Sequence, residues 1–287
     1  MDKQNVGILH PGDMGISVAA TVQNSGHAVY WCSEGRSPQT RARAEQHGLI
    51  DAGSLANLCG LCAMIVSVVP PDAAESLAAQ VLSQGFKGLF IDANAIAPQR
   101  TQRIGEAMAE AGASFVDGGI IGEPAWKPNT TWLYLSGKAA HQAADYFAAG
   151  PLQTRVIGDA VGKASALKMC FAAYTKGTTA LLCAVLATAE SLDVRAELEQ
   201  QWSHNGSNFA EQSANSVRRV TAKAWRFAGE MEEIAATFDH AGMPGEFHLA
   251  AAEIYRRMAE FKGAPATPPL ETVLMALLRG DSAKDTD

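Results

Sequence analysis

The sequence is poor in the features that define disulfide-bonded and membrane proteins. Only five of its 287 residues are cysteine, an odd number spread thinly along the chain, so we expect no disulfide framework. No apolar run approaches the roughly 18 residues that a membrane-spanning helix needs. Even the run ALLCAVLATA ends at Glu190. We therefore expect a chain that does not span a membrane.

Positive charge is also scarce, because 23 Lys and Arg stand against 30 Asp and Glu, for a formal net charge of -7. Nucleic acids and anionic membranes attract clustered Lys and Arg, so neither is an expected partner. A small-molecule substrate is favoured instead. The first residues, MDKQNVGILH, lack the basic flank and long apolar stretch of a secretory signal, which predicts a cytoplasmic location.

Apolar residues are plentiful, at 47% of the chain against 18% charged residues, which is enough for a packed core. The first half alternates short β-branched runs with helical stretches such as 15–24 and 73–84. This alternation is typical of α/β proteins, in which a doubly wound parallel sheet carries crossover helices. The expected strands are residues 5–9, 27–32, 63–69, 88–92, 114–117, 131–135 and 154–157.

The pattern changes after Gly158, where strand-like runs disappear and helical spacing continues to about Arg279. We therefore predict two domains, the first over residues 1–160 and an all-helical second over residues 161–287. Residues 164–190 are apolar around most of a helix circumference, which predicts a helix buried on several sides. Gly177 lies in the middle of this stretch and costs about 1 kcal/mol relative to Ala, which indicates a kink or a close backbone approach.

The strongest local signal is the segment HPGDMG between the first expected strand and the first expected helix. Its spacing is that of G-x-G-x-x-G, with His10 in the first glycine position. Gly12 would let the backbone approach a pyrophosphate, and Gly15 would permit close packing of helix on strand. The residues expected around the phosphates are His10, Pro11, Gly12, Asp13 and Met14.

The residue type at the end of the second expected strand distinguishes a site for NAD(H) from a site for NADP(H). An acidic residue there would bind a free adenosine ribose, whereas Arg or Ser would suit a 2′-phosphate. The sequence offers Ser33, Glu34 and Arg36, and Arg36 is followed by Arg41 and Arg43. We favour NADP(H), bound by Ser33 and Arg36. NAD remains the alternative, with Glu34 on the ribose and the arginines on a solvated helix face.

Several motifs together resemble the β-hydroxyacid dehydrogenase superfamily, which includes 6-phosphogluconate dehydrogenase, 3-hydroxyisobutyrate dehydrogenase and the imine reductases. The motifs are VGILHPGDMG, SVVPP, IDANAIAP, FVDGGIIG and GKASALK, and they cover the first half of the chain and the start of the helical half. More narrowly, HPGDMG, VDGGIIG and KMCFAAYTKG resemble a branch of NAD(P)-dependent oxidoreductases with a C-terminal domain of unknown function.

The resemblance implies a Rossmann domain, a helical domain and a homodimer in which the helical domains pack together. It places Lys168 on the catalytic lysine, which donates or accepts the proton of the substrate oxygen. Asn94 falls in a loop on the nicotinamide side, and Val69 and Pro70 fall near the cofactor riboses.

The chain also departs from this family. Ala172 stands four residues after Lys168, where the family usually has Asn, and Ile121 replaces a carboxylate-binding Ser. No clear counterpart of the family's C-terminal Lys-Asp pair is found around residues 230–233. We infer that the fold and redox chemistry are retained while the substrate has changed. The expected substrate-binding residues are Gly119, Ile120, Ile121 and Gly122.

Lys168 lies among apolar neighbours, where burial would lower its pKa toward the range useful for acid-base catalysis. A lysine whose stem packs on an apolar helix while its charge reaches water is the structural alternative. On a helix, Thr175 shares the face of Lys168 and would hydrogen-bond the substrate, and Tyr174 is a second candidate for proton transfer.

Three tryptophans are candidates for the wall of an apolar pocket, although each also suits a core or a dimer interface: Trp126, Trp132 and Trp225. Cys59 and Cys62 have C-x-x-C spacing but lack the context of a thioredoxin or a zinc site, so we expect buried thiols. The seven histidines show no metal-ligand spacing, and no metal is expected.

The sequence thus predicts an NAD(P)-dependent oxidoreductase of the CH–OH group, acting on a small apolar or aromatic hydroxy compound. Two alternatives stay open. Loss of Asn at Ala172 and of Ser at Ile121 also suits an imine reductase, and His10 in a glycine position suits a nucleotide-binding protein without catalysis.

Overall fold

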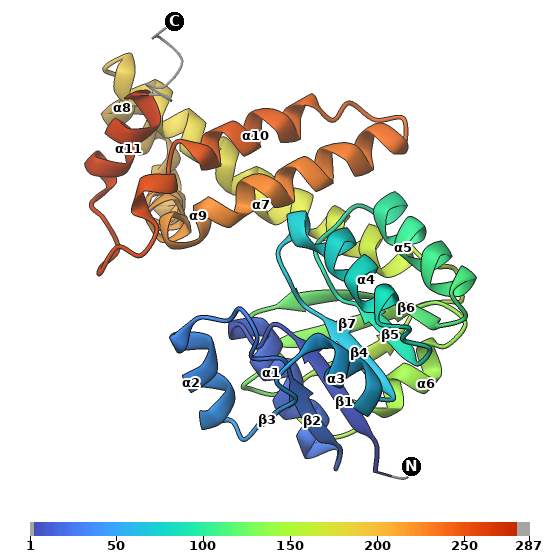
Figure 1. Cartoon of the computed structure of the whole chain (residues 1–287). Coiled ribbons are helices and arrows are strands. Elements are labelled where there is room, and N and C mark those ends of the chain that lie inside the picture. The colour runs from blue at the N-terminus through green and yellow to red at the C-terminus, as the bar shows by residue number, and fades with distance from the viewer. Residues whose placement is uncertain (1–2, 280–287) are drawn as a thin grey trace, which may run out of the picture. The chain divides into compact units, whose positions relative to one another are not determined.

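The computed structural model describes residues 3–279, which form two compact units divided between Met169 and Cys170 (Figure 1). The division falls inside a long helix, α7 (Lys163–Ser191), and not in the coil that precedes it. The first turns of α7 therefore belong to the N-terminal unit, and the remainder belongs to the C-terminal unit.

The N-terminal unit is built on one eight-stranded sheet with the order β3-β2-β1-β4-β5-β6-β7-β8. The strands are β1 (Asn5–Leu9), β2 (Ala28–Trp31), β3 (Ile50–Asp51), β4 (Met64–Ser67), β5 (Leu89–Asp92), β6 (Ser114–Gly122), β7 (Thr131–Ser136) and β8 (Gln153–Val156). Every neighbouring pair is parallel except β6 and β7, whose short connection leaves no room for a crossover helix.

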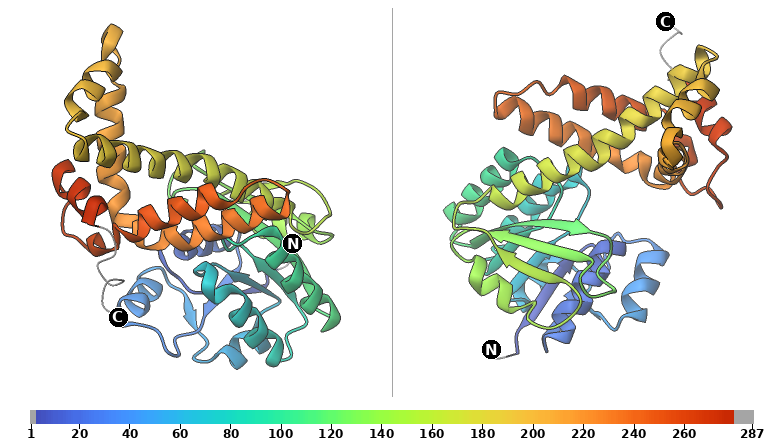
Figure 2. Two further views of the ribbon diagram at one scale, coloured as in Figure 1. Left: turned by 90° about the horizontal axis from the view of Figure 1, so that it is seen from above. Right: turned by 180° about the vertical axis from the view of Figure 1, so that it is seen from behind.

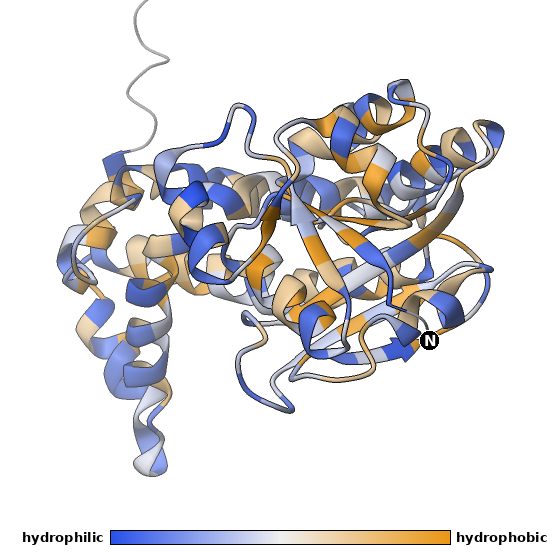
Figure 3. Ribbon diagram, turned by 60° about the horizontal axis from the view of Figure 1, so that its bottom comes forward, coloured by the Kyte–Doolittle hydropathy of each residue, from blue (hydrophilic) through white to orange (hydrophobic). Residues whose placement is uncertain are grey.

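Helices cover both faces of the sheet, as Figure 1 shows. One core cluster contains residues of α1 (Asp13–Asn24), α2 (Pro38–Gln46) and α6 (Ala140–Asp145). The other contains residues of α3 (Leu55–Leu61), α4 (Ala74–Ser83) and α5 (Pro98–Glu110). Successive strand residues enter opposite clusters, as Ile8 and Leu9 do, because strand side chains alternate between faces. The central strands are correspondingly apolar in Figure 3.

The sheet has a topological switch point at β1. This strand pairs with β2 on one side and with β4 on the other, so the chain order reverses there. In doubly wound sheets, ligands bind outside the carboxyl ends of the strands at such a switch point. The loops that follow Leu9, Trp31 and Ser67 therefore form the expected ligand-binding edge.

The C-terminal unit consists of helices throughout its described part. After α7 come α8 (Arg195–Trp202), α9 (Phe209–His240), α10 (Glu246–Arg256) and α11 (Leu270–Arg279). α9 and α10 lie side by side in both views of Figure 2. Gly177 on α7 packs against α10, because a β-carbon there would lie 3.4 Å from the Phe247 ring. This is an ordinary van der Waals contact, so the kink or close backbone approach at Gly177 stays a prediction.

α7 is long and apolar enough to cross a membrane by length and composition alone. In its most apolar window, 39% is buried inside the structure. Core helices of soluble proteins pass the same test, so this helix is not a clear membrane span.

The predicted fold class is confirmed: a doubly wound, mainly parallel sheet is followed by a helical region. Two strand predictions differ from the structure. β3 was not expected because it has only two residues. β6 was expected to end at Asp117 but continues to Gly122, because pairing with β7 holds Gly118 and Gly119 extended despite the low strand propensity of glycine.

Candidate functional site

The turn after β1 has an unusual backbone at His10. This residue has a φ of 71°, in the left-handed region that glycine favours. His10 therefore adopts the conformation expected of the first glycine in the motif. Its carbonyl accepts a hydrogen bond from the Gly12 N–H at 2.8 Å, which closes the tight turn.

The next two glycines meet different surroundings. Gly12 is the N-cap of α1, and no side chain caps that helix. A β-carbon at Gly12 would lie 3.5 Å from the His10 ring, in ordinary contact, whereas one at Gly15 would overlap the His10 carbonyl oxygen. Gly15 thus serves the packing of helix on strand, while Gly12 leaves the amino end of α1 open to an anion.

This difference predicts opposite effects for two alanine variants. Gly12→Ala should leave the free energy of unfolding within about 0.5 kcal/mol of wild type. It should weaken dinucleotide binding about tenfold or more, because its methyl group occupies the space beside the turn. Gly15→Ala should instead lower the free energy of unfolding by about 1–3 kcal/mol, because the helix must move off the strand.

Chemical denaturation and nucleotide titration of both variants check this prediction. A Gly12→Ala protein that binds like wild type would contradict the assignment of the turn. So would a Gly15→Ala protein that is as stable as wild type.

The loop after β2 holds three arginines in distinct ways. Arg41 donates from Nη2 to the Ser33 carbonyl at 2.6 Å and from Nε to the Arg36 carbonyl at 3.3 Å, so it shapes the loop. Arg36 is half-buried, and its Nε has no hydrogen-bond partner among the described residues. Of the three arginines, Arg36 is therefore best placed to donate hydrogen bonds to a ligand phosphate. Ser33 is buried beside it.

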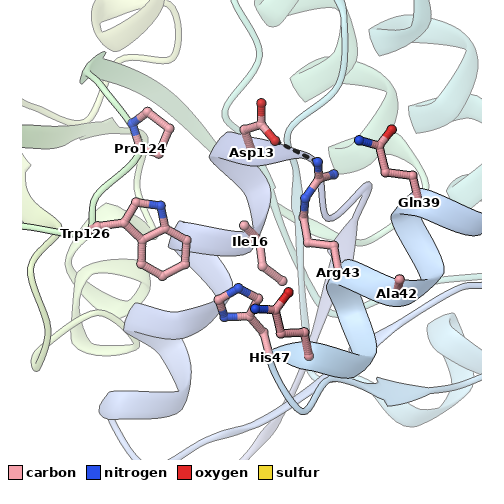
Figure 4. A pocket seen from close by; sticks show the side chains of 9 residues that line it. Asp13, Ile16, Gln39, Ala42, Arg43, His47, Pro124 and Trp126 are labelled. Atoms are coloured by element: carbon pink, nitrogen blue, oxygen red, sulfur yellow. Dashed lines mark ion pairs between the residues drawn. The ribbon is translucent and has the colours of Figure 1, made fainter.

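Arg43 is engaged on α2. Its Nη2 lies 2.8 Å from the Asp13 carboxylate, and its Nη1 donates to the Pro11 carbonyl at 3.3 Å. The ion pair is drawn as a dashed line in Figure 4. Arg43 therefore ties α2 to the first turn of α1 and supports the phosphate turn from outside.

The same ion pair borders an open pocket of about 550 Å³ (Figure 4). Trp126 is 48% exposed there and stacks on His47, with ring centroids 5.1 Å apart. The lining residues are Asp13, Ile16, Gln39, Ala42, Arg43, Gln46, His47, Pro124 and Trp126. Trp126 thus borders a pocket, but most of the other lining side chains are polar or charged, so its place in the wall of an apolar substrate pocket stays a prediction. Of the expected cofactor residues, only Asp13 lines it.

Asn94 is buried between the loops that follow β4 and β5. Its Oδ1 accepts the Val69 N–H at 2.6 Å, and its Nδ2 donates to the Ser67 hydroxyl at 3.1 Å. The amide therefore fixes the backbone of Val69, next to the exposed Pro70. Its place on the nicotinamide side stays a prediction.

The buried carboxyl group of Asp92 holds the backbone of Asn94. Asp92 accepts the Asn94 backbone N–H at 3.0 Å, and its Oδ2 has no hydrogen-bond partner among the described residues. Burial raises the pKa of Asp92 to about 7, with a further contribution from Asp117 on the neighbouring strand. Because this pKa is above the unfolded value, the stability that protonated Asp92 contributes is lost as the pH rises toward 7.

Asp117 on β6 caps the amino end of α7. Its carboxylate accepts the backbone N–H groups of Gly162, Ala164 and Ser165 at 2.9–3.2 Å. It also accepts the hydroxyls of Ser165 at 2.6 Å and Ser136 at 2.8 Å. Burial raises the pKa of Asp117, and the hydrogen bonds from Ser165 and Ser136 oppose that rise. A carboxylate at this end of a helix satisfies its unpaired donors.

Lys168 follows this cap on α7 and is half-buried. A β-carbon at Gly119 would lie 2.5 Å from the Ala164 carbonyl oxygen and 3.3 Å from Cβ of Lys168. Glycine at position 119 therefore lets α7 lie directly against β6. The structure thus brings Lys168 and Gly119 together, and a substrate site shared by the two stays a prediction.

The other expected substrate residues lie on β6 and not in a loop. Ile120 and Ile121 are buried in the strand, and Gly122 is exposed at its end with a φ of 128°. Thr175 donates its hydroxyl hydrogen bond to the Phe171 carbonyl, and Tyr174 is 74% exposed. The roles of these residues in substrate binding and catalysis stay predictions.

The cysteines match the expectation of buried thiols at residues 59 and 62. Both are unpaired, and burial raises the pKa of Cys59 to about 11 and that of Cys62 to about 12. Neither thiol is ionised near neutral pH, which argues against a redox role. Residues 3–279 contain no group of three or more His, Cys, Asp or Glu that could hold a metal ion.

Some site features had no clear signal in the sequence. The sequence pattern around α2 is typical of a solvated helix face, yet three of its polar residues line the pocket: Gln39, Gln46 and His47. The capping role of Asp117 had no local signal, because the backbone N–H groups that it accepts lie 45–48 residues further along the chain.

Family models match both parts of the chain. Residues 5–146 match the NAD binding domain of 6-phosphogluconate dehydrogenase. The chain carries an NAD-binding domain of the 6-phosphogluconate dehydrogenase family. Residues 189–258 match a domain of unknown function, DUF1932. This pairing confirms the resemblance inferred from the motifs and the predicted NAD(P)-binding Rossmann domain.

The chain is also similar to an uncharacterised 28.5 kDa protein from Methanothermus fervidus. The two are 31% identical over 170 residues, which are 59% of this chain and 65% of the relative. The chain therefore matches just under two thirds of that relative's length.

Solved structures share the fold over nearly the whole chain. A conserved protein described as similar to 3-hydroxyacid dehydrogenases is 25% identical, with a TM-score of 0.66 and coverage of 90% of this chain and 97% of that one. The 3-hydroxyisobutyrate dehydrogenase of Mycobacterium tuberculosis is 17% identical, with a TM-score of 0.69 and coverage of 96% and 99%. A reductive aminase from Aspergillus terreus, solved with NADPH, is 15% identical, with a TM-score of 0.57 and coverage of 95% and 99%.

Proposed function

We propose that this protein is an NAD(P)-dependent oxidoreductase, with a preference for NADP(H), that interconverts a small apolar or aromatic hydroxy compound and its carbonyl form. The observation that carries the proposal is the placement of Lys168. Asp117 caps its helix and Gly119 admits that helix onto β6, all within the unit that holds the dinucleotide turn.

The residues present fit a dinucleotide. The amino end of α1 has no side-chain cap, Gly12 leaves space for a pyrophosphate, and Arg36 Nε has no partner among the described residues. His10, Pro11, Gly12, Asp13 and Met14 would surround the diphosphate, and Ser33 and Arg36 the adenosine ribose with its 2′-phosphate. Val69, Pro70 and Asn94 would lie along the rest of the cofactor.

The chemistry divides between cofactor and protein. A bound nicotinamide supplies the hydride donor or acceptor. Lys168 would hold the proton: its neutral amine accepts the hydroxyl proton during oxidation, and its ammonium returns a proton to the oxygen during reduction. Backbone and side chains around Gly119–Gly122 would orient the substrate. Thr175 and Tyr174 lie on the part of α7 that belongs to the C-terminal unit and stay candidates for substrate binding and proton transfer.

The substrate class follows from what surrounds these positions. Ala172 and Ile121 are apolar and buried where the resembling family has polar side chains for a small hydroxy acid. Neither side chain offers a hydrogen-bond partner to a carboxylate, and an unpaired charge is costly to bury.

The direct test is titration with NADPH and NADH, followed by turnover assays over matched alcohols and ketones. The expected result is micromolar NADPH binding and reduction of apolar ketones. If NADPH binds but no substrate in a broad panel turns over, the chain binds nucleotide without catalysis. If neither nucleotide binds, the proposed function is wrong.

Arg36→Gln should change the cofactor preference. Loss of one charge-assisted phosphate contact should weaken NADPH binding about tenfold and leave NADH binding within about twofold. Arg155→Gln is the matched control, since it removes the same charge from β8, at the far end of the sheet order from β2. Equal weakening of both nucleotides by Arg36→Gln would contradict the assignment to the 2′-phosphate.

Imine reduction is a second candidate. The observation that favours it is the same apolar character at Ala172 and Ile121, because an imine substrate needs no carboxylate contact. Assays with matched ketones and cyclic imines separate the two candidates.

We also propose a homodimer in the cytoplasm. Four large apolar side chains of α7 are exposed in the single chain: Leu167, Phe171, Tyr174 and Leu181. They recur at helical spacing on one side of the helix, and covering them would bury an otherwise exposed apolar surface.

A further inference from the structure

The residue that departs most from the dinucleotide motif is His10. Its backbone adopts the left-handed conformation of the glycine that it replaces, so the turn keeps its shape. What the substitution adds is an imidazole ring. The function of this ring rests on the proposed dinucleotide site.

The ring lies beside the space expected for the phosphates. Its Cδ2 and Nε2 are both 3.5 Å from the position that a β-carbon of Gly12 would occupy. That position is vacant because residue 12 is glycine, and the amino end of α1 opens onto it. An anion that approaches Gly12 would therefore contact the imidazole.

The surroundings of the ring are positive. Arg36, on the loop after β2, and Arg43, on α2, both act electrostatically on His10. Asp13 on α1 is paired with Arg43 and offsets part of its charge. The amino end of α1 adds partial positive charge. Glu34, on the same loop as Arg36, is exposed.

These surroundings disfavour the charged form of the unliganded ring. Burial lowers the pKa of His10 below 6.5, and the charges of Arg36 and Arg43 lower it further. The Nδ1 atom is buried without a hydrogen-bond partner among the described residues. Burial and the two arginines thus disfavour the charged form of the ring, and a bound phosphate would offset the contribution of the arginines.

We propose that His10 is a cofactor-binding residue that takes up a proton from solvent when the diphosphate of a dinucleotide binds, and so becomes a cation of the phosphate site beside Arg36. Binding places negative charge next to the ring and offsets the two arginines. The bound state therefore favours imidazolium, and one proton enters with the nucleotide.

The sign of the pH dependence follows. The pKa of His10 is higher in the bound state than in the free state, so the added affinity is fully present below the free-state value. It is lost as the pH rises through the bound-state value. Nucleotide affinity should therefore fall as the pH increases across the neutral range.

The test compares wild type with His10→Asn, because Asn tolerates the left-handed backbone but does not titrate. NADPH and NADH are titrated from pH 6 to pH 8.5 by fluorescence. Calorimetry at pH 7 in buffers of different ionisation enthalpy counts the protons taken up. Comparing the two proteins with one nucleotide cancels the titration of the 2′-phosphate, and NADH lacks that group.

For wild type, we expect net proton uptake on NADH binding and a several-fold or greater loss of affinity over this pH range. For His10→Asn, uptake should vanish and the affinity should change less than twofold. His10→Gly restores the glycine of the motif and should match His10→Asn in its flat profile, which provides a second variant with a relaxed turn.

Two results would overturn the proposal and can be told apart. If the nucleotides bind but wild type and His10→Asn share one pH profile, His10 takes up no proton and the dinucleotide site stands. If neither nucleotide binds to wild type at any pH, the dinucleotide site itself is absent, and His10 has no phosphate to meet.

Discussion

Replacing Lys168 with Met is expected to reduce turnover by about a thousandfold or more while NADPH binding stays within about twofold of wild type. Methionine keeps the length and much of the packing of the lysine stem but cannot carry a proton. Since Lys168 lies on α7 and the dinucleotide turn lies on β1 and α1, removing the amine should not disturb the nucleotide contacts. Steady-state kinetics with the best substrate, together with fluorescence titration of NADPH, measures both quantities.

Lys163→Met is the matched control for this variant. Lys163 begins the same helix and is exposed, so its loss removes an equal charge without touching the proposed substrate position. It should leave turnover near wild type. Near-normal turnover of Lys168→Met would remove this residue from the mechanism, and an equal loss in both variants would point to a general effect of charge on α7.

The second large effect is expected at the cap of α7. Asp117→Asn should lower the free energy of unfolding by about 2–4 kcal/mol, because the amide NH₂ cannot accept the hydrogen bonds that a carboxylate oxygen receives. The affected donors are buried backbone groups of Gly162 and Ala164, which have no water to replace the lost acceptor. Chemical denaturation measures this change.

Asp159→Asn provides the control, because Asp159 is exposed shortly before the same helix. It should change the free energy of unfolding by less than about 0.5 kcal/mol. If Asp117→Asn is as stable as this control, the carboxylate does not hold the helix. In the folded fraction of Asp117→Asn, turnover should fall more than NADPH affinity, because the cap positions Lys168 and not the nucleotide.

The parts of the site that follow local spacing could be predicted from the sequence. Gly12 and Gly15 occur at fixed offsets after an apolar strand, and the structure shows the open helix end and the close packing that these offsets imply. The alternation of strands and helices similarly predicted the doubly wound sheet. Each of these features depends on residues within a few positions of one another.

Features that depend on distant residues could not be predicted in this way. The role of Asp117 requires the first turn of α7 to reach β6. The pocket beside Trp126 requires α2 to lie near the loop after β6. Its polar residues on α2 match the ordinary pattern of a helix facing solvent, so only the assembled sheet distinguishes the two interpretations.

The cap of α7 also constrains the order in which the chain folds. The hydrogen bonds to Asp117 join residues 45–48 positions apart, and they need β6 in place, with Ser136 of β7 beside it. Long-range contacts of this kind form late, because the loop between their ends must close first. The interior of the 29-residue helix propagates through local hydrogen bonds, but its first turn docks only after the sheet has assembled. We therefore expect Lys168 to reach its place late in the folding of the N-terminal unit, so that partly folded chains do not yet present it beside Gly119.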